Sequence, residues 1–204
     1  MLCLSVDTRI TPLEFLPAPD RLDPHATEAH VWRADLDAPG WPGAEELPED
    51  ERLRAEAILR PGAGERWAAS RWALRGVLSR YLGQSAGELR FEVGEHGKPR
   101  LAPATEPAFN LSHSGNVVLI ALASGREVGV DVERIARRPR AFYEDWTERE
   151  ARLKCLGTGF AARTAEEPPL GIHRLDPGPG YAACLAVSEP VAKLRCWTFD
   201  PPLR

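Results

Sequence analysis

Two carboxylates in the stretch GVDVE, residues 129–133, have the spacing of a metal-binding pair. Side chains alternate across a β-strand, so Asp131 and Glu133 lie side by side on one face while the valines occupy the other. Neighbouring carboxylates repel each other unless a positive charge lies between them. The pattern therefore fits either the exposed face of an edge strand or a pair of oxygen ligands for Mg²⁺, which prefers one or two carboxylates together with substrate phosphates.

A third carboxylate lies on the helix expected after this strand, in the stretch WTEREARLK. Residues three and four apart lie above one another on a helix, so one face is shared by Trp146, Glu150, Leu153 and Lys154. The Trp and the Leu indicate that this face is at least partly buried. An ordinary surface ion pair between Glu150 and Lys154, contributing about 0.3 kcal/mol, is the alternative. If Glu150 meets the two strand carboxylates, the three acids predict a metal site beside which Lys154 holds a phosphate.

The stretch FNLSHSGN, residues 109–116, places a histidine between two hydroxyls just before a glycine. It predicts a strand that breaks into a loop at SHSG, followed by a second strand. Hydroxyls, backbone N–H groups and an imidazole bind phosphate oxygens without bulk, and glycine lets the backbone approach closely. A capping or structural role is the alternative for His113. Lys98 in the preceding GKP stretch adds charge if it faces the same site and serves solubility if it does not.

The elements expected to position these groups are a mixture of strands and helices. Alternating or short apolar runs predict strands, and apolar residues at helical spacing, ended by glycine or proline, predict helices. The order is mixed, which predicts an α+β protein with largely antiparallel sheets. Strands are expected at 31–36, 109–111, 117–124, 126–135, 170–176, 181–187 and 192–200, a strand pair within 89–102, and helices at 49–59, 65–82 and from 142 to the glycines at 157 and 159.

Composition and charge limit the class of protein. The 204 residues are 43% hydrophobic and 27% charged, which is ordinary for one domain or for two small lobes that share a core. A net charge of −4 argues against a general nucleic-acid binder, although 26 Lys plus Arg can supply a local basic pocket. The four cysteines lack a zinc spacing, the N-terminus lacks the pattern of a secretory signal, and no stretch approaches a membrane span. We expect a cytoplasmic protein with reduced thiols that binds neither nucleic acid nor membrane.

Taken in order, the stretches GKP, FNLSHS, GVDVE and WTEREARLK resemble the motif set of 4'-phosphopantetheinyl transferases of the Sfp type. The motifs run from Gly97 to Phe160 and are specific as an ordered set, although SHS or GVDVE alone would be weak. The resemblance implies a pseudo-two-fold arrangement of two similar α+β lobes, expected at residues 1–125 and 126–204 without a long linker. It also implies that coenzyme A (CoA) binds in the cleft between them.

The resemblance further implies a reaction, in which the 4'-phosphopantetheine arm of CoA moves to a serine of an apo acyl or peptidyl carrier protein and 3',5'-ADP leaves. A monomer that uses Mg²⁺, or alternatively Mn²⁺, is expected. The implied metal ligands are Asp131, Glu133 and Glu150. The implied catalytic groups are Glu150 as base, Lys154 on the transferring phosphate and His113 on the pyrophosphate. Contacts to CoA are implied for Arg75, Gly97, Lys98, Pro99, Ser112, His113 and Lys154, with Arg75 on the 3'-phosphate and Arg66 and Arg60 as weaker alternatives.

Two departures from the family pattern lie around the Trp helix. Arg149 stands where relatives have Lys before the Glu, which keeps the charge. The additional acidic, helical segment that relatives carry is missing, so RIARRPRAFYEDW runs directly from the strand into the helix. In relatives that segment lies near the surface that docks the carrier. The basic run Arg134, Arg137, Arg138 and Arg140 stands in its place and could attract an acidic carrier, a solvated connection being the alternative.

Two other functions fit parts of the same pattern. A homologue that binds CoA or a carrier without transfer fits the shortened segment. A metal-dependent phosphohydrolase fits the acids, but nothing else in the sequence favours it. The preserved acids favour an active transferase.

Overall fold

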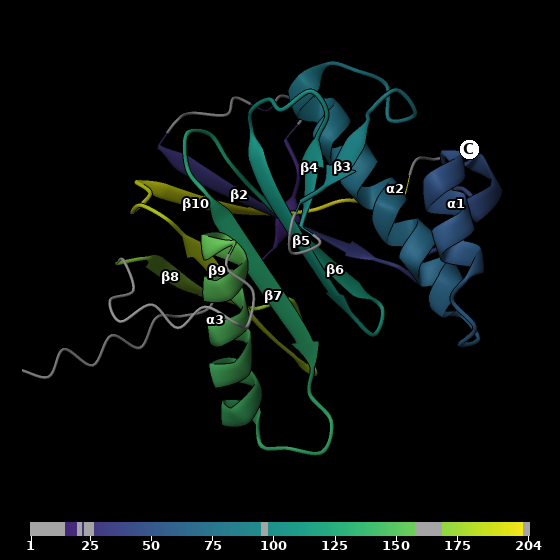
Figure 1. Ribbon diagram of the computed structural model, residues 1–204. Coiled ribbons are helices and arrows are strands. Elements are labelled where there is room, and N and C mark those ends of the chain that lie inside the picture. Colours follow the sequence, from purple (N-terminus) through teal and green to yellow (C-terminus); the bar gives the residue numbers. More distant parts are fainter. Residues whose placement is uncertain (1–14, 20–21, 23–26, 95–97, 158–168, 202–204) are drawn as a thin grey trace, which may run out of the picture.

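The computed structural model of the chain describes residues 15–19, 22, 27–94, 98–157 and 169–201 (Figure 1). Its helices are α1 (Glu49–Glu56), α2 (Ala63–Leu82) and α3 (Arg140–Leu156), with a short 3-10 turn, η1 (Ala44–Glu46), before α1. The strands are β1 (Leu16–Pro17), β2 (Glu28–Asp35), β3 (Phe91–Val93), β4 (Pro99–Leu101), β5 (Ala108–Ser114), β6 (Val117–Ala123), β7 (Val128–Arg134), β8 (Gly171–Leu175), β9 (Tyr181–Val187) and β10 (Lys193–Thr198).

Two sheets form the centre of the molecule. A five-stranded sheet has the order β1-β10-β2-β6-β5, and a three-stranded sheet has the order β7-β9-β8. Pairing is antiparallel except where β10 runs parallel to β2 and to β1. The expected α+β class with mostly antiparallel sheets is therefore confirmed. The last strand, β10, belongs to the five-stranded sheet, whose other strands all precede residue 125. A division of the chain near residue 125 therefore separates the strands of the two sheets with the exception of β10.

The layers follow from the apolar faces of the strands. One core joins α2 to the five-stranded sheet through residues such as Leu74, Leu78 and Ile120. A second core joins the opposite face of that sheet to the three-stranded sheet, where the valines of GVDVE pack as the alternation predicts. The small side chains of α3 cover the outer face of the three-stranded sheet. The result is helix, sheet, sheet and helix in succession, with α1 and α2 on the opposite side of the molecule from α3 (Figure 1).

The face of α3 that is expected to be partly buried is half-buried at Glu150, Leu153 and Lys154, but the most deeply buried side chains lie on the neighbouring face. Thr147, Ala151 and Cys155 are buried, whereas Trp146 is 36% exposed. The reason is the close approach of the helix to β7 at Gly129, where a Cβ would collide with the backbone of α3. Only small side chains fit at such a distance, so the bulky residues of the helix point elsewhere. The helix ends as predicted at Gly157, which has φ +67°.

The SHSG stretch is a strand end and not the loop that we expected. β5 continues through Ser114, which pairs with Val117, and only Gly115 and Asn116 form the turn. Gly115 has a positive φ of +59°. Glycine is the residue favoured at the first central position of a type II′ hairpin turn, where φ is positive. The strand alternates polar side chains on one face with Phe109, Leu111 and His113 on the other, so the hydroxyls and the histidine point in opposite directions. Within the described residues, no helix has the length and apolar character needed to cross a membrane.

Candidate active site

Side chains join the neighbouring strands β5 and β7, which belong to different sheets. Backbone N–H groups of alternate β7 residues donate to polar side chains of alternate β5 residues. The pairs are Val130 to Asn110 Oδ1 (2.9 Å), Val132 to Ser112 Oγ (3.4 Å) and Arg134 to Ser114 Oγ (3.1 Å). The side chains of β5 thus replace a main-chain ladder and satisfy amide groups along β7, of which that of Val130 is buried.

The same two hydroxyls hold the two carboxylates of GVDVE. Ser112 donates to Asp131 Oδ1 at 2.8 Å, and Ser114 donates to Glu133 Oε2 at 2.9 Å. A hydroxyl can donate one hydrogen bond while it accepts others, so each serine serves both the backbone and a carboxylate. The serines therefore orient the acids, a function that the sequence interpretation as a phosphate-binding loop did not anticipate.

Lys154 reaches across from α3 to the same acids. Its Nζ donates to Asp131 Oδ1 at 2.6 Å and to the carbonyl of Val130 at 3.2 Å. Asp131 is only 4% exposed. Two carboxylate oxygens near this contact, Asp131 Oδ2 and Glu150 Oε1, are buried without a hydrogen-bond partner among the described residues. Buried carboxylate oxygens without a donor are costly, and a bound cation is one way to satisfy them.

The electrostatics of the acids point the same way. Burial raises the pKa of Glu150, and the charge of Asp131 raises it further. Burial also raises the pKa of Glu133, with a smaller contribution from Asp131. Burial is the larger cause of both shifts and the charge of Asp131 adds to it, and a divalent cation beside these carboxylates would favour their charged forms. Among the described residues, however, no three Asp, Glu, His or Cys side chains stand close enough to one another to form a finished metal cage. Ser112 and Lys154 orient the side chain of Asp131, and Ser114 orients that of Glu133.

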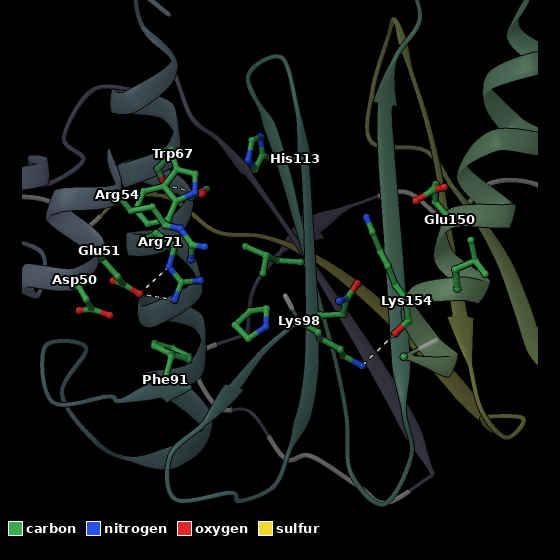
Figure 2. Close-up of a pocket in the computed structure, with 16 residues that line it drawn as sticks. Asp50, Glu51, Arg54, Trp67, Arg71, Phe91, Lys98, His113, Glu150 and Lys154 are labelled. Atoms are coloured by element: carbon green, nitrogen blue, oxygen red, sulfur yellow. Dashed lines mark hydrogen bonds and ion pairs between the residues drawn. The ribbon is translucent and has the colours of Figure 1, made fainter. Parts of the chain in front are cut away.

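A cavity of about 460 Å³ opens beside Glu150 and Lys154, with α1 and α2 on one side and α3 on the other (Figure 2). Its volume is in the range of small-molecule sites. The lining includes the basic or imidazole side chains of Arg54, Arg71, Lys98, His113 and Lys154, the acids Asp50, Glu51 and Glu150, and apolar walls from Trp67, Phe91, Leu111 and Leu153. Five groups that can carry positive charge around an apolar slot suit a ligand with several phosphates and a flat ring.

His113 and Lys98 both lie at this cavity. The His113 ring points away from the two serines and is exposed; partial desolvation by neighbouring atoms and the charge of Lys154 lower its pKa. Lys98 Nζ bonds Glu127 at 2.9 Å and the carbonyls of Val128 and Lys154 at 3.1 and 3.3 Å. It therefore ties the β3-β4 hairpin to β7 and to the end of α3 (Figure 2). Pro99 also lines the cavity, and Gly97 falls outside the described residues.

The arginine of α2 in the cavity is Arg71, which the sequence interpretation missed. Its guanidinium lies over the ring of Phe91, 4.7 Å from the centroid, and is bonded to the buried Glu51. Arg75 lies 2% exposed, where it bonds the other Glu51 oxygen at 2.8 Å and the carbonyls of Ala86 and Leu89. Arg66 pairs instead with Asp37. The spacing of Arg71 four residues from Arg75 and from Trp67 was the available signal that Arg71 shares their face.

Curated proteins with similar sequences share one activity in their names. The chain is 31% identical over 180 residues to 4'-phosphopantetheinyl transferase HetI of Nostoc sp., covering 72% of this chain and 76% of that protein. It is 46% identical over 89 residues to 4'-phosphopantetheinyl transferase AcpT of Escherichia coli O157:H7, covering 44% of this chain and 40% of that protein. It is 26% identical over 158 residues to 4'-phosphopantetheinyl transferase Sfp of Bacillus subtilis, covering 55% of this chain and 70% of that protein. A scan against protein-family models finds none that matches. The acids of β7 and α3, the adjoining basic cavity and the similarity to HetI together establish that the chain belongs to the 4'-phosphopantetheinyl transferases.

Proposed function

We propose that the chain transfers the 4'-phosphopantetheine arm of CoA to a serine of an apo acyl or peptidyl carrier protein and releases 3',5'-ADP. The observation that carries the proposal is the ion pair of Lys154 with the buried Asp131 at 2.6 Å, next to a cavity that Lys154 and Glu150 line. The family membership supplies the reaction class. A transfer of this kind depends on positioning and on neutralising charge at phosphate oxygens, which is what these side chains can do.

Mg²⁺, or Mn²⁺ in its place, fits the acids of β7 and α3. Asp131, Glu133 and Glu150 would hold it, and the two carboxylate oxygens without partners support this assignment. When bound, the ion would neutralise the pyrophosphate and lower the pKa of a bound water or hydroxyl. Ser112 and Ser114 hold the strand carboxylates in place through the hydrogen bonds described above.

The remaining groups bind and orient CoA and move the proton. We assign Lys154 to the transferring phosphate and His113 to the pyrophosphate, since both line the cavity next to the acids. Glu150 takes the proton of the carrier serine, directly or through a water, and its raised pKa suits a proton acceptor. At the far side of the cavity Arg71 replaces Arg75 as our candidate for the 3'-phosphate, beside Phe91 as a platform for the base.

The wider architecture stays a prediction. Two lobes related by a pseudo-two-fold axis, at 1–125 and 126–204, fit the two sheets apart from β10. We place the reaction in the cytoplasm and take the chain to act as a monomer.

Mass spectrometry of purified apo carrier domains incubated with CoA and Mg²⁺ tests the proposal. We expect the carrier to gain the phosphopantetheine mass while 3',5'-ADP appears in equal amount. Unchanged carrier mass with intact CoA binding would show a non-enzymatic homologue. Release of phosphopantetheine in the absence of any carrier would show a phosphohydrolase. Asp131→Ala should abolish the mass gain and leave the protein folded, because the Asp131 side chain packs in none of the apolar cores.

A further inference from the structure

The turn between β5 and β6 comes directly after Ser114, the residue whose hydroxyl donates to Glu133 Oε2 at 2.9 Å. Side chains of β5, and not a main-chain ladder, join this strand to β7. The place of the Ser114 hydroxyl beside Glu133 therefore depends on the contacts that fix the turn at Gly115 and Asn116.

The hydroxyl of Tyr181, in β9, lies against this turn. It donates to Asn116 Oδ1 at 2.6 Å and accepts from the backbone N–H of Asn116 at 3.3 Å. A Cβ added at Gly115 would lie 2.6 Å from the hydroxyl oxygen, so the phenol and the turn are in direct contact. Tyr181 is only 8% exposed. Removing its hydroxyl would leave the Asn116 oxygen without its donor, a loss that surrounding water replaces poorly at a buried position.

Asn116 is held from its other side by β2. Its side-chain amide donates to Asp35 Oδ1 at 2.9 Å, and its carbonyl accepts from the backbone N–H of Leu36 at 2.7 Å. Because the amide nitrogen faces a carboxylate and the amide oxygen faces a hydroxyl, both ends of the side chain have the partner that they require. The turn after Ser114 is thus held between β2 of the five-stranded sheet and β9 of the three-stranded sheet.

Tyr181 also contacts the two segments that carry the acids. In the antiparallel register of β7 and β9 it pairs with Arg134, the residue after Glu133. Its carbonyl accepts from the guanidinium of Arg140, the first residue of α3, at 2.9 Å. One residue therefore contacts β7, α3 and the turn that follows β5. These three segments supply the carboxylates of the candidate metal site and the serines that orient two of them.

We propose that Tyr181 is a positioning residue of the metal site. Its hydroxyl holds the turn between β5 and β6, the turn places the Ser114 hydroxyl, and that hydroxyl keeps Glu133 in the orientation that binds the cation. Tyr181 acts through Ser114 and does not itself bind the cation. The inference rests on the proposed transferase function and its metal site, and it adds a residue that lies outside the sequence motifs of that function.

Mn²⁺ binding in the presence of CoA, followed by electron paramagnetic resonance, tests the proposal without relying on turnover. Tyr181→Phe keeps the ring and removes the hydroxyl. We expect its Mn²⁺ affinity to fall about fivefold, which corresponds to one hydrogen bond of about 1 kcal/mol. Tyr81→Phe is the matched control. The Tyr81 hydroxyl bonds Trp32 Nε1 at 2.9 Å and His30 Nδ1 at 2.8 Å in the core between α2 and the five-stranded sheet, so its loss should leave the Mn²⁺ affinity unchanged.

Combining Tyr181→Phe with serine variants separates the proposed path from a general loss of structure. In a Ser114→Ala background, Tyr181→Phe should weaken Mn²⁺ binding no further, because the hydroxyl that Tyr181 positions is gone. In a Ser112→Ala background it should still weaken binding about fivefold, because Ser112 donates to Asp131 and not to Glu133. Equal further losses in both backgrounds would overturn the proposal, as would an unchanged affinity in Tyr181→Phe alone.

The outcomes also separate this inference from the proposed function. If the wild type binds Mn²⁺ and modifies a carrier, but Tyr181→Phe binds Mn²⁺ as tightly as Tyr81→Phe, the positioning role is wrong and the function stands. If the wild type binds no Mn²⁺, the metal site and this inference fail together, and carrier modification decides separately on the transferase. Circular dichroism checks that each variant is folded. If Tyr181→Phe does not fold, Asn116→Ala, which removes the acceptor of the same hydrogen bond, replaces it with the same expected and contradicting results.

Discussion

Replacing Ser112 by alanine removes one hydroxyl from the junction between β5 and β7. That hydroxyl donates to Asp131 Oδ1 at 2.8 Å and accepts a long bond from the backbone of Val132 at 3.4 Å. A hydrogen bond to a charged group contributes about 1.5–3 kcal/mol. Lys154 remains on the same carboxylate oxygen at 2.6 Å, so we expect the lower end of that range.

The loss should appear in the metal requirement of the reaction. A side chain that orients a metal ligand changes metal affinity about 10- to 100-fold when it is removed. A change of about 1.4 kcal/mol corresponds to a tenfold change in affinity. Because Lys154 still holds Asp131, we expect Ser112→Ala to lower the Mg²⁺ affinity by about tenfold. The Mg²⁺ concentration for half-maximal transfer should rise by about that factor, while the KM for CoA stays the same.

The assay is a Mg²⁺ titration of carrier modification at saturating CoA, with a CoA titration at saturating Mg²⁺. Ser79→Ala is the matched control, because the Ser79 hydroxyl donates to the carbonyl of Arg75 within α2, away from the acids. A rise in the KM for CoA with an unchanged Mg²⁺ requirement would refute the reasoning. It would mean that Ser112 binds a phosphate of CoA, as the sequence resemblance implies, and does not serve to orient Asp131.

Three further predictions concern stability. Gly129→Ala forces a methyl group into the backbone of α3 and should lower the free energy of unfolding by about 1–3 kcal/mol or more in chemical denaturation, whereas an unchanged value would show that α3 does not pack as described. Glu51→Gln leaves two buried arginines without their carboxylate and should lower the free energy of unfolding by about 3–5 kcal/mol. Glu56→Gln, in an exposed ion pair, should lower it by only about 0.5 kcal/mol, and equal losses in the two variants would contradict the buried network. The Arg195 guanidinium lowers the pKa of Glu28 to about 2 from 4.5, so its contribution to stability is present above about pH 4.5 and is lost as the pH falls toward 2. Thermal melts should therefore show Glu28→Gln to be less stable than the wild type at pH 7, by a margin that narrows below pH 4.5, and a margin that does not depend on pH would count against this pairing.

The sequence predicted the features that depend on the alternation of side chains along a strand and on the residues that end a helix. Asp131 and Glu133 lie opposite the valines because a strand has a period of two, and Gly157 ends α3 because it adopts a left-handed conformation. The valines pack in the core as expected, and the strands and helices appear close to their predicted positions.

What the sequence did not predict depends on packing between distant segments. The SHSG stretch looked like a loop because serine and glycine favour turns, but β7 supplies N–H groups and carboxylates that satisfy those hydroxyls in a strand. Trp146 and Leu153 indicated a partly buried face of α3, but the approach of α3 to Gly129 places small side chains on the most deeply buried face, which the sequence did not indicate. Arg71 lies one turn from Arg75, the arginine chosen on helix register. Both bind Glu51, but Arg75 also binds the carbonyls of Ala86 and Leu89, and only Arg71 of the two lines the cavity.

Electron paramagnetic resonance of Mn²⁺ tests the central claim that the acids of β7 and α3 together hold one divalent cation. Titrating the protein with Mn²⁺ in the presence of CoA should show one bound ion per chain in the wild type. In Asp131→Asn, or in Glu150→Gln, binding should weaken by at least tenfold while the protein remains folded by circular dichroism. Undiminished Mn²⁺ binding in both variants would contradict the account, because the cation would then lie somewhere other than between these carboxylates.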